Sequence, residues 1–198
     1  PSNPPRPAPA RPLLPALLAL IVAALAGCAS TQVEWAGTAP PAPVCRAGEA
    51  PLPMRLQWRP RWRADQKEPE RREAAVREGL QRFVAGAACL SVAAIERWDD
   101  DEVPVATPST APNAPARLWI EVTELGPVLK VGSPTVVEGG TEVRLRLVFH
   151  DPRRGPTVSR TEVHWRHGGP FVVRGVATLA DDLADALVRS LLTAPSTR

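Results

Sequence analysis

The side chains that could carry out metal or acid–base chemistry are few and poorly grouped. His164 and His167 are three residues apart, on a segment that we expect to be a strand, where an odd offset points side chains to opposite faces. His150 could face His164 across a turn, but zinc would need a further cysteine, histidine or carboxylate at about 2 Å. The acidic run 99–102 lacks the alternating acids and central glycine of an EF-hand loop. We therefore predict no metal site, no cofactor and no catalytic residue, and a protein that is not an enzyme.

Arginine and tryptophan are concentrated in one stretch of the chain. This stretch contains Arg55, Trp58, Arg59, Arg61 and Trp62, with Arg63 directly after them. Guanidinium and indole groups together suit anionic headgroups or glycan phosphates, so we predict a possible ligand surface here. The alternative is a half-buried strand whose arginine-rich end is solvated and balanced by nearby acidic residues.

A cysteine follows an apolar segment near the start of the sequence. The apolar run covers residues 13–26 and is preceded by Arg6 and Arg11, with no acidic residue before Cys28. A membrane-spanning helix needs roughly 20 apolar residues, and this run is shorter. The pattern is typical of a secretory signal peptide.

The end of this segment, Leu25-Ala26-Gly27-Cys28, resembles the lipobox of bacterial lipoproteins. The resemblance implies that residues 1–27 are a cleaved signal peptide and that Cys28 becomes the acylated first residue, carrying palmitate-type chains. Because Ala29-Ser30 and not aspartate follows the cysteine, it also implies an outer-membrane anchor with the domain facing the periplasm. Inner membrane and cell surface are alternatives for the location. An ordinary secretory signal and a short hydrophobic anchor are alternatives to the lipobox.

The remaining cysteines, Cys45 and Cys89, would lie in a compartment that permits disulfides. We predict a bridge between them, and the alternative is two unpaired thiols with Cys89 buried as a small apolar side chain. The predicted cleavage also removes two arginines and no acidic residue, so the precursor charge of +3 becomes nearly neutral. We therefore predict no nucleic-acid partner.

The rest of the chain has the periodicities of one mixed domain. We interpret residues 28–51 as the acylated cysteine and a proline-rich tether, 52–193 as a single α/β domain with a long loop at 99–116, and 194–198 as a tail. Apolar side chains with helical spacing predict helices at 69–86 and 172–191. Mixed signals favour a strand at 90–98, and alternation with period two predicts strands at 54–59, 118–125, 143–149 and 158–166.

These elements predict an α+β fold. We expect a two-layer sandwich with a mostly antiparallel sheet of about four to five strands, two helices on one face, and the order β-α-β-β-β-β-α. Three features resemble small α/β domains of envelope lipoproteins. They are the helix at 69–86 leading to a strand, the apolar strand followed by Asp, a turn and Gly over 145–155, and the final helix at 179–192. The domains that they resemble are those of the CsgG-like secretion lipoproteins and the penicillin-binding-protein activators, and the amino-terminal domain of TolB. The resemblance carries over no functional residue.

The sequence thus favours a membrane-anchored envelope lipoprotein. We hypothesise that it is a non-enzymatic accessory or interaction domain in envelope assembly, secretion or transport, which meets the membrane through its lipid and another envelope protein through its domain. The alternative is a lipid- or glycan-binding lipoprotein, including an auxiliary component of a lipid ABC transporter. An unrecognised hydrolase is a third hypothesis. The partner's identity and the oligomeric state stay open.

Overall fold

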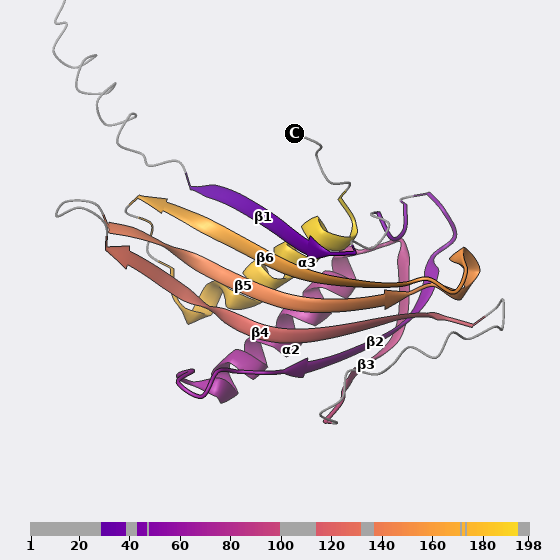
Figure 1. Cartoon of the computed structure of the whole chain (residues 1–198), viewed down its shortest axis with the longest axis horizontal. Coiled ribbons are helices and arrows are strands. Elements are labelled where there is room, and N and C mark those ends of the chain that lie inside the picture. Colours follow the sequence, from indigo (N-terminus) through magenta and orange to yellow (C-terminus); the bar gives the residue numbers. More distant parts are fainter. Residues whose placement is uncertain are drawn as a thin grey trace, which may run out of the picture.

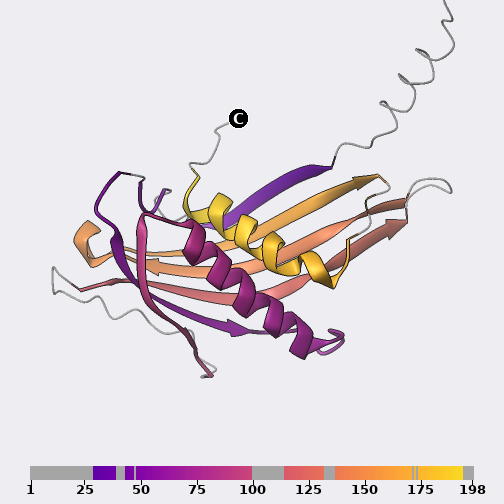
Figure 2. The same cartoon turned by 180° about the vertical axis from the view of Figure 1, so that it is seen from behind.

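The computed structural model describes residues 29–38, 43–46, 48–99, 114–131, 137–170, 172 and 174–193. The predicted signal peptide, Cys28, the tail 194–198 and most of the predicted loop 99–116 lie outside the described residues. The described chain forms one sheet with two helices packed on one of its faces (Figures 1 and 2). No helix within these ranges is long and apolar enough to cross a membrane.

The sheet has six strands in the order β1-β6-β5-β4-β2-β3. The strands are β1 (Ser30–Gly37), β2 (Leu52–Pro60), β3 (Leu90–Arg97), β4 (Ala116–Val131), β5 (Val137–His150) and β6 (Val158–Pro170). The helices are α2 (Pro69–Gly86) and α3 (Leu179–Leu191), with short 3-10 turns η1 (Pro152–Arg154) and η2 (Val176–Thr178).

The predicted sheet is wrong in strand number and in pairing. The sheet is mixed, because β2 pairs in parallel with both β3 and β4, whereas the pairs β4–β5, β5–β6 and β1–β6 are antiparallel. The crossover through α2 makes β2 and β3 parallel. The chain is α+β with two helices, but the four to five mostly antiparallel strands are replaced by six in a mixed sheet.

The strand that sequence reasoning missed is β1, which lies in the segment assigned to the tether. It pairs along its length with β6, from Ser30 opposite Gly168 to Gly37 opposite Thr161. Most of its side chains are exposed, and Val33 packs against the core. An edge strand of this kind shows little apolar alternation, which is why the segment looks like a linker.

The core lies between the sheet and the two helices. Helix α2 begins with Pro69 and has Glu70 in its first turn, both favourable at a helix N-terminus. It buries Leu80 and Phe83, and it crosses α3 closely. A Cβ at position 79 would lie 2.8 Å from the Ala180 carbonyl oxygen, so Gly79 allows the two helices to approach.

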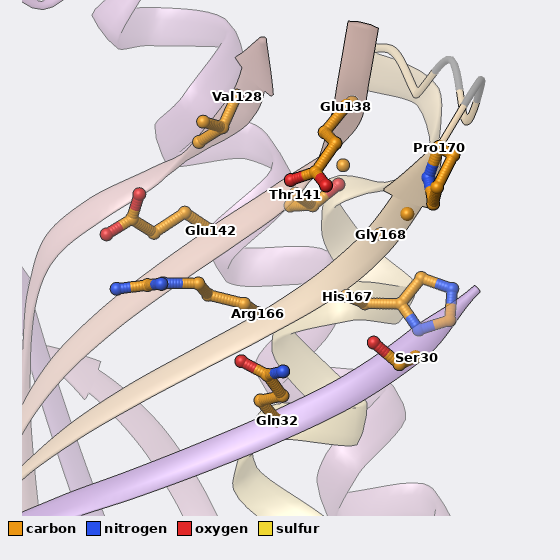
Figure 3. Close-up of a pocket in the computed structure, with 13 residues that line it drawn as sticks. Ser30, Gln32, Val128, Glu138, Thr141, Glu142, Arg166, His167, Gly168 and Pro170 are labelled. Carbon is orange, nitrogen blue, oxygen red and sulfur yellow. The ribbon is translucent and has the colours of Figure 1, made fainter. Parts of the chain in front are cut away.

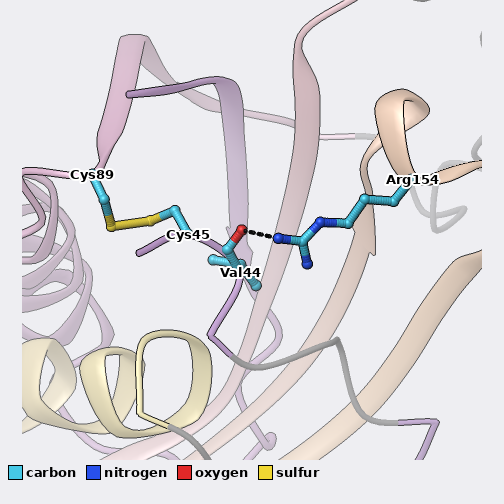
Figure 4. Close-up of a disulfide and its surroundings, with 4 residues drawn as sticks. All are labelled: Val44, Cys45, Cys89 and Arg154. Atoms are coloured by element: carbon cyan, nitrogen blue, oxygen red, sulfur yellow. Dashed lines mark hydrogen bonds between the residues drawn. A yellow bond between two sulfur atoms is a disulfide. The ribbon is translucent and has the colours of Figure 1, made fainter. Parts of the chain in front are cut away.

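A disulfide joins Cys45 to Cys89, with the two Cα atoms 5.7 Å apart (Figure 4). The backbone beside it is also held, because the Val44 N–H donates to the Leu191 carbonyl at 2.8 Å and the Val44 carbonyl accepts from Arg154 at 3.1 Å. Both Val44 and Cys45 are buried. This part of the expected tether is therefore fixed to the domain, beside the end of α3.

The disulfide should contribute measurably to stability. Its two cysteines are 44 residues apart, and closing a loop of this length contributes about 2–4 kcal/mol in typical cases. We expect the Cys45→Ser/Cys89→Ser variant to lose about this much free energy of unfolding in urea titrations. A variant at the exposed position 91, Ser91→Ala, serves as the control. Equal unfolding midpoints for the double variant and the unmodified protein would contradict the prediction.

Candidate functional site

The face of the sheet that carries no helix has charged side chains arranged in rows across the strands. In the first row, Glu121 on β4 lies opposite Arg146 on β5, which lies opposite Glu162 on β6. Arg146 donates to Glu121 at 3.1 Å and to Glu162 at 3.0 Å. The hydrogen bond to Glu162, opposed by partial burial and reinforced by Glu121, raises the pKa of Arg146.

Glu121 is the centre of this row. Its side chain is buried, and Arg59 on β2 donates to it through Nε at 2.8 Å and through a second guanidinium nitrogen. Arg59, also buried, lies 5.1 Å from the ring centroid of Trp98. The buried carboxylate is thus held by two guanidinium groups, and Arg61 lies at 3.8 Å.

A second charged group contains Arg144 on β5, His164 opposite it on β6, and Glu142 two residues before Arg144. Arg144 Nε donates to Glu142 at 2.7 Å, and His164 Nε2 lies 2.5 Å from the same carboxylate, with Glu34 at 3.6 Å on the other side of the ring. Burial raises the pKa of Glu142, but the hydrogen bond from Arg144 and the charges of Arg144 and His164 outweigh it, so the pKa is lowered overall. Glu142 is therefore ionised at neutral pH and is poorly suited to donate a proton.

A hollow of about 810 Å³ opens beside these rows. We call it the arginine trough. It is lined by Arg61, Trp62, Arg63, Thr123, Glu124, Pro127, Val128, Leu129, Glu142, Arg144 and Arg146.

The four arginines of the trough are largely exposed to solvent. Their side chains are 62 % exposed for Arg61, 66 % for Arg63, 55 % for Arg144 and 50 % for Arg146. Three of these arginines lie within hydrogen-bonding distance of a carboxylate that is less exposed than they are. Arg63, for example, lies 3.1 Å from the Glu124 carboxylate. A guanidinium has five N–H donors, and the contacts within the described chain engage one or two nitrogens of each. The trough can therefore bind carboxylate, phosphate or sulfate groups through charge-assisted hydrogen bonds.

A smaller hollow of about 250 Å³ continues from the trough towards β1 (Figure 3). The two hollows share Val128 and Glu142. The floor of the smaller one is made by paired glycines of β5 and β6. A Cβ at Gly168 would lie 2.3 Å from the Gly139 carbonyl oxygen, so close approach of the two strands requires glycine there. Arg166 and Glu142 lie side by side two residues along the same strands from Gly168 and Gly140 (Figure 3).

The structure separates the five residues of the predicted ligand surface. Trp58 is buried in the core between sheet and helices, and Arg59 is paired with Glu121. Arg55 is exposed on the helix-free face, outside both hollows. Arg61 and Trp62 line the trough. Alternation along β2 explains the separation, because it points Trp58 to one face and its neighbours to the other.

Two of the four trough arginines, Arg144 and Arg146, were missed by sequence reasoning, whereas Arg63 belongs to the arginine- and tryptophan-rich stretch. The alternation of Arg144 and Arg146 with apolar residues in 143–149 was a usable signal, but it did not indicate what lies opposite them. Cys28, the predicted lipidation site, lies outside the described residues.

The histidines are not brought together. His150 is buried and lies opposite Val158, not opposite His164, while His167 contacts Thr31 at 2.7 Å. Within the described ranges, no group of three or more His, Cys, Asp or Glu residues could hold a metal ion.

No family model and no curated protein matches this sequence. Solved structures with a similar arrangement include a PelC dodecamer from Paraburkholderia phytofirmans, with a TM-score of 0.42 and 13 % identity over 82 % of this chain and 99 % of that one. A putative neuraminyllactose-binding hemagglutinin homolog from Helicobacter pylori has a TM-score of 0.34 and 11 % identity over 71 % and 82 %. A minor lipoprotein from Acinetobacter baumannii has a TM-score of 0.29 and 14 % identity over 71 % and 92 %. At these values the similarities assign neither a family nor a function.

Removing the Glu121 carboxylate should destabilise the protein strongly. The buried Arg59 would then lose its ion pair with Glu121, and breaking a buried ion pair costs about 3–5 kcal/mol. The matched control is Glu162→Ala, which removes an exposed partner of the same arginine row and should cost at most about 1 kcal/mol. Urea unfolding of Glu121→Ala and Glu162→Ala measures both, and losses of equal size would contradict the assigned role of Glu121.

Proposed function

We propose that this protein is a membrane-anchored envelope lipoprotein, acylated at Cys28, that acts as a non-enzymatic accessory or interaction protein in envelope assembly, secretion or transport. The observation that carries the proposal is that strand β1 begins at Ser30, two residues after the cysteine of the lipobox-like sequence. The folded domain is then joined to the lipid almost directly. The Cys45–Cys89 disulfide supports an oxidising compartment such as the periplasm, and we propose the outer membrane as the location.

The helix-free face supports an interaction role more than a catalytic one. Its central carboxylates, Glu121 and Glu142, are held by arginines, and the lowered pKa of Glu142 keeps that carboxylate an acceptor. A carboxylate in this state positions guanidinium groups and does not transfer a proton readily. We propose that the arginine trough offers these guanidinium groups to another envelope protein.

The anchor and the interaction role can be tested together. Cys28→Ala should abolish labelling by an alkynyl fatty acid and block maturation, whereas the control Cys45→Ser should keep its label. A photoreactive amino acid at position 144, in the trough, should crosslink to an envelope protein in intact cells, and the same group at Arg77, an exposed position of α2, should not. A labelled Cys28→Ala variant would refute the anchor, and equal crosslinking at both positions would refute the interaction face.

A second candidate function is the binding of an anionic glycan or lipid headgroup, and the trough itself favours it. Four largely exposed arginines line one hollow together with Trp62, whose buried indole N–H has no hydrogen-bond partner in the described chain. Arginine forks bind carboxylate and phosphate groups with two parallel hydrogen bonds. The indole ring of Trp62 beside them could stack on a sugar ring.

Loss of two trough arginines should weaken binding to an acidic polymer. We expect Arg63→Gln/Arg144→Gln to bind polygalacturonate at least about tenfold more weakly, equivalent to about 1.4 kcal/mol. Arg55→Gln/Arg160→Gln is the matched control, because both residues are exposed on the same face outside the trough and the charge lost is equal. The affinities are measured by calorimetry at two salt concentrations. Equal weakening of both variants would indicate only a general charge effect and would contradict a site.

A further inference from the structure

The outer edge of strand β1 is open. In the described chain β1 pairs with β6 and with no other strand, and Figures 1 and 2 show it as the outermost strand on its side of the sheet. Most of its side chains are exposed. An open edge presents unpaired backbone N–H and C=O groups, which another strand can pair with.

The other edge of the sheet, β3, is better protected. The pairing of β3 with β2 shifts in register between Met54 and Leu56, and β3 ends in Glu96 and Arg97, of which Arg97 is in ion pairs with two carboxylates. Bulges and charged side chains are features by which proteins protect a strand edge from pairing. Strand β1 has an unbroken register with β6 and contains neither proline nor lysine.

One hydrogen bond shows which backbone groups of β1 point outwards. The Thr38 N–H donates to the Arg160 carbonyl at 2.9 Å, and in an antiparallel pair the residues that exchange such bonds recur at every second position. The even-numbered residues of β1 therefore bond to β6. The N–H and C=O groups of Thr31, Val33 and Trp35 point along the open edge, away from β6.

The side chains of β1 alternate between the two faces of the sheet. Val33 and Trp35 lie opposite core residues of β6, on the side of the helices, whereas Gln32 and Glu34 lie on the helix-free side. Trp35 is 39 % exposed, and it is one of two exposed large apolar side chains in the described ranges. The open edge thus carries an uncovered aromatic ring on one face and an amide and a carboxylate on the other.

We propose that two copies of this chain pair antiparallel through β1, about a twofold axis that places Val33 opposite the partner's Val33. Thr31 then lies opposite the partner's Trp35, and the outward N–H and C=O groups of all three residues are hydrogen-bonded. The exposed indole packs on a β-branched threonine, a cross-strand pairing that stabilises antiparallel sheets. On the helix-free face, the Gln32 amide lies opposite the partner's Glu34 and can donate to its carboxylate.

The neighbouring registers are less favourable. Because only the odd-numbered residues of β1 have outward groups on either copy, the register can move only in steps of two residues. One step in one direction places Glu34 opposite the partner's Glu34, and directly opposed like charges destabilise a pair of strands. One step in the other direction places Trp35 beyond Ser30, the first residue of the partner's strand. The sequence of β1 therefore favours a single register.

Such a dimer joins the two sheets into one. The helix-free faces become continuous, and the smaller hollow, which Gln32 lines, is bordered by the partner's Glu34. The pairing needs only the folded domain, so it holds whether or not Cys28 carries a lipid.

Cysteines at positions 32 and 34, both exposed, test the dimer and its register. Position 32 faces the partner's position 34 in a pair whose Cα atoms are about 4.5 Å apart, which a disulfide can span, whereas two copies of either position are diagonal neighbours about 7–8 Å apart. Gln32→Cys and Glu34→Cys, as full chains with different tags, are produced together in the same cells, which are then treated with a mild oxidant.

The matched control is Ser91→Cys together with Ala93→Cys, two exposed positions of the β3 edge. The unmodified protein, in which Cys45 and Cys89 are already joined, gives the background. The further change Trp35→Pro removes an outward N–H without affecting the hydrogen bonds to β6, so it weakens the dimer and leaves the domain folded.

We expect at least about tenfold more disulfide-linked dimer from the mixture of Gln32→Cys and Glu34→Cys than from either variant alone. Adding Trp35→Pro to both should reduce this yield at least about tenfold. Efficient crosslinking of Glu34→Cys to itself would overturn the proposed pairing, because it requires the register that opposes the two glutamates. Equal yields from the β1 and β3 mixtures, or a β1 cysteine linked only to a different protein, would overturn the dimer.

Discussion

When helices cover only one face of a sheet, charged side chains on the other face must find their ion-pair partners on the neighbouring strands. Glu121 shows this constraint most clearly, because its carboxylate is buried on the side without helices. Leaving it without partners would cost on the order of several kcal/mol, and the strand register brings Arg59 and Arg146 to it from the neighbouring strands. Arg146 contacts Glu121 through Nη1 and Glu162 through Nε, and half of its side chain is exposed to solvent. The same pairing that stabilises the sheet therefore also presents guanidinium groups along the trough.

Sequence reasoning found the elements whose own side chains repeat with a clear period, and it missed what depends on pairing. The two helices and strands β4, β5 and β6 follow from such repeats. Strand β1 was missed because it has one apolar side chain that packs against the core, Val33, and so shows no apolar repeat. It is stabilised by its backbone pairing with β6. The trough was missed for a related reason. Arg61 and Arg144 are far apart in sequence, and only the parallel pairing of β2 with β4 and the antiparallel pairing of β4 with β5 bring them to one hollow.

Strand β1 changes how the proposed anchor would act. A proline-rich tether over 28–51 would let the domain sample many distances and orientations above the membrane. With β1 in the sheet from Ser30 and Cys45 bound to Cys89, little free chain remains between a lipid on Cys28 and the core. A partner would then meet the domain at a nearly fixed height. Such a constraint favours a partner-binding surface close to the membrane over one far from it.

The position of the trough follows from an irregularity in β4. The register of β4 against β5 shifts between Val122 and Glu124, which is a β-bulge. Val122 and Leu125 are three residues apart and would face opposite sides of a regular strand, yet both are fully buried. The bulge keeps both apolar side chains in the core and turns Glu124 towards Arg63 on the other face. Bulges also increase the local twist of a strand, and this one lies where the face is hollowed, so the core and the trough depend on the same extra residue.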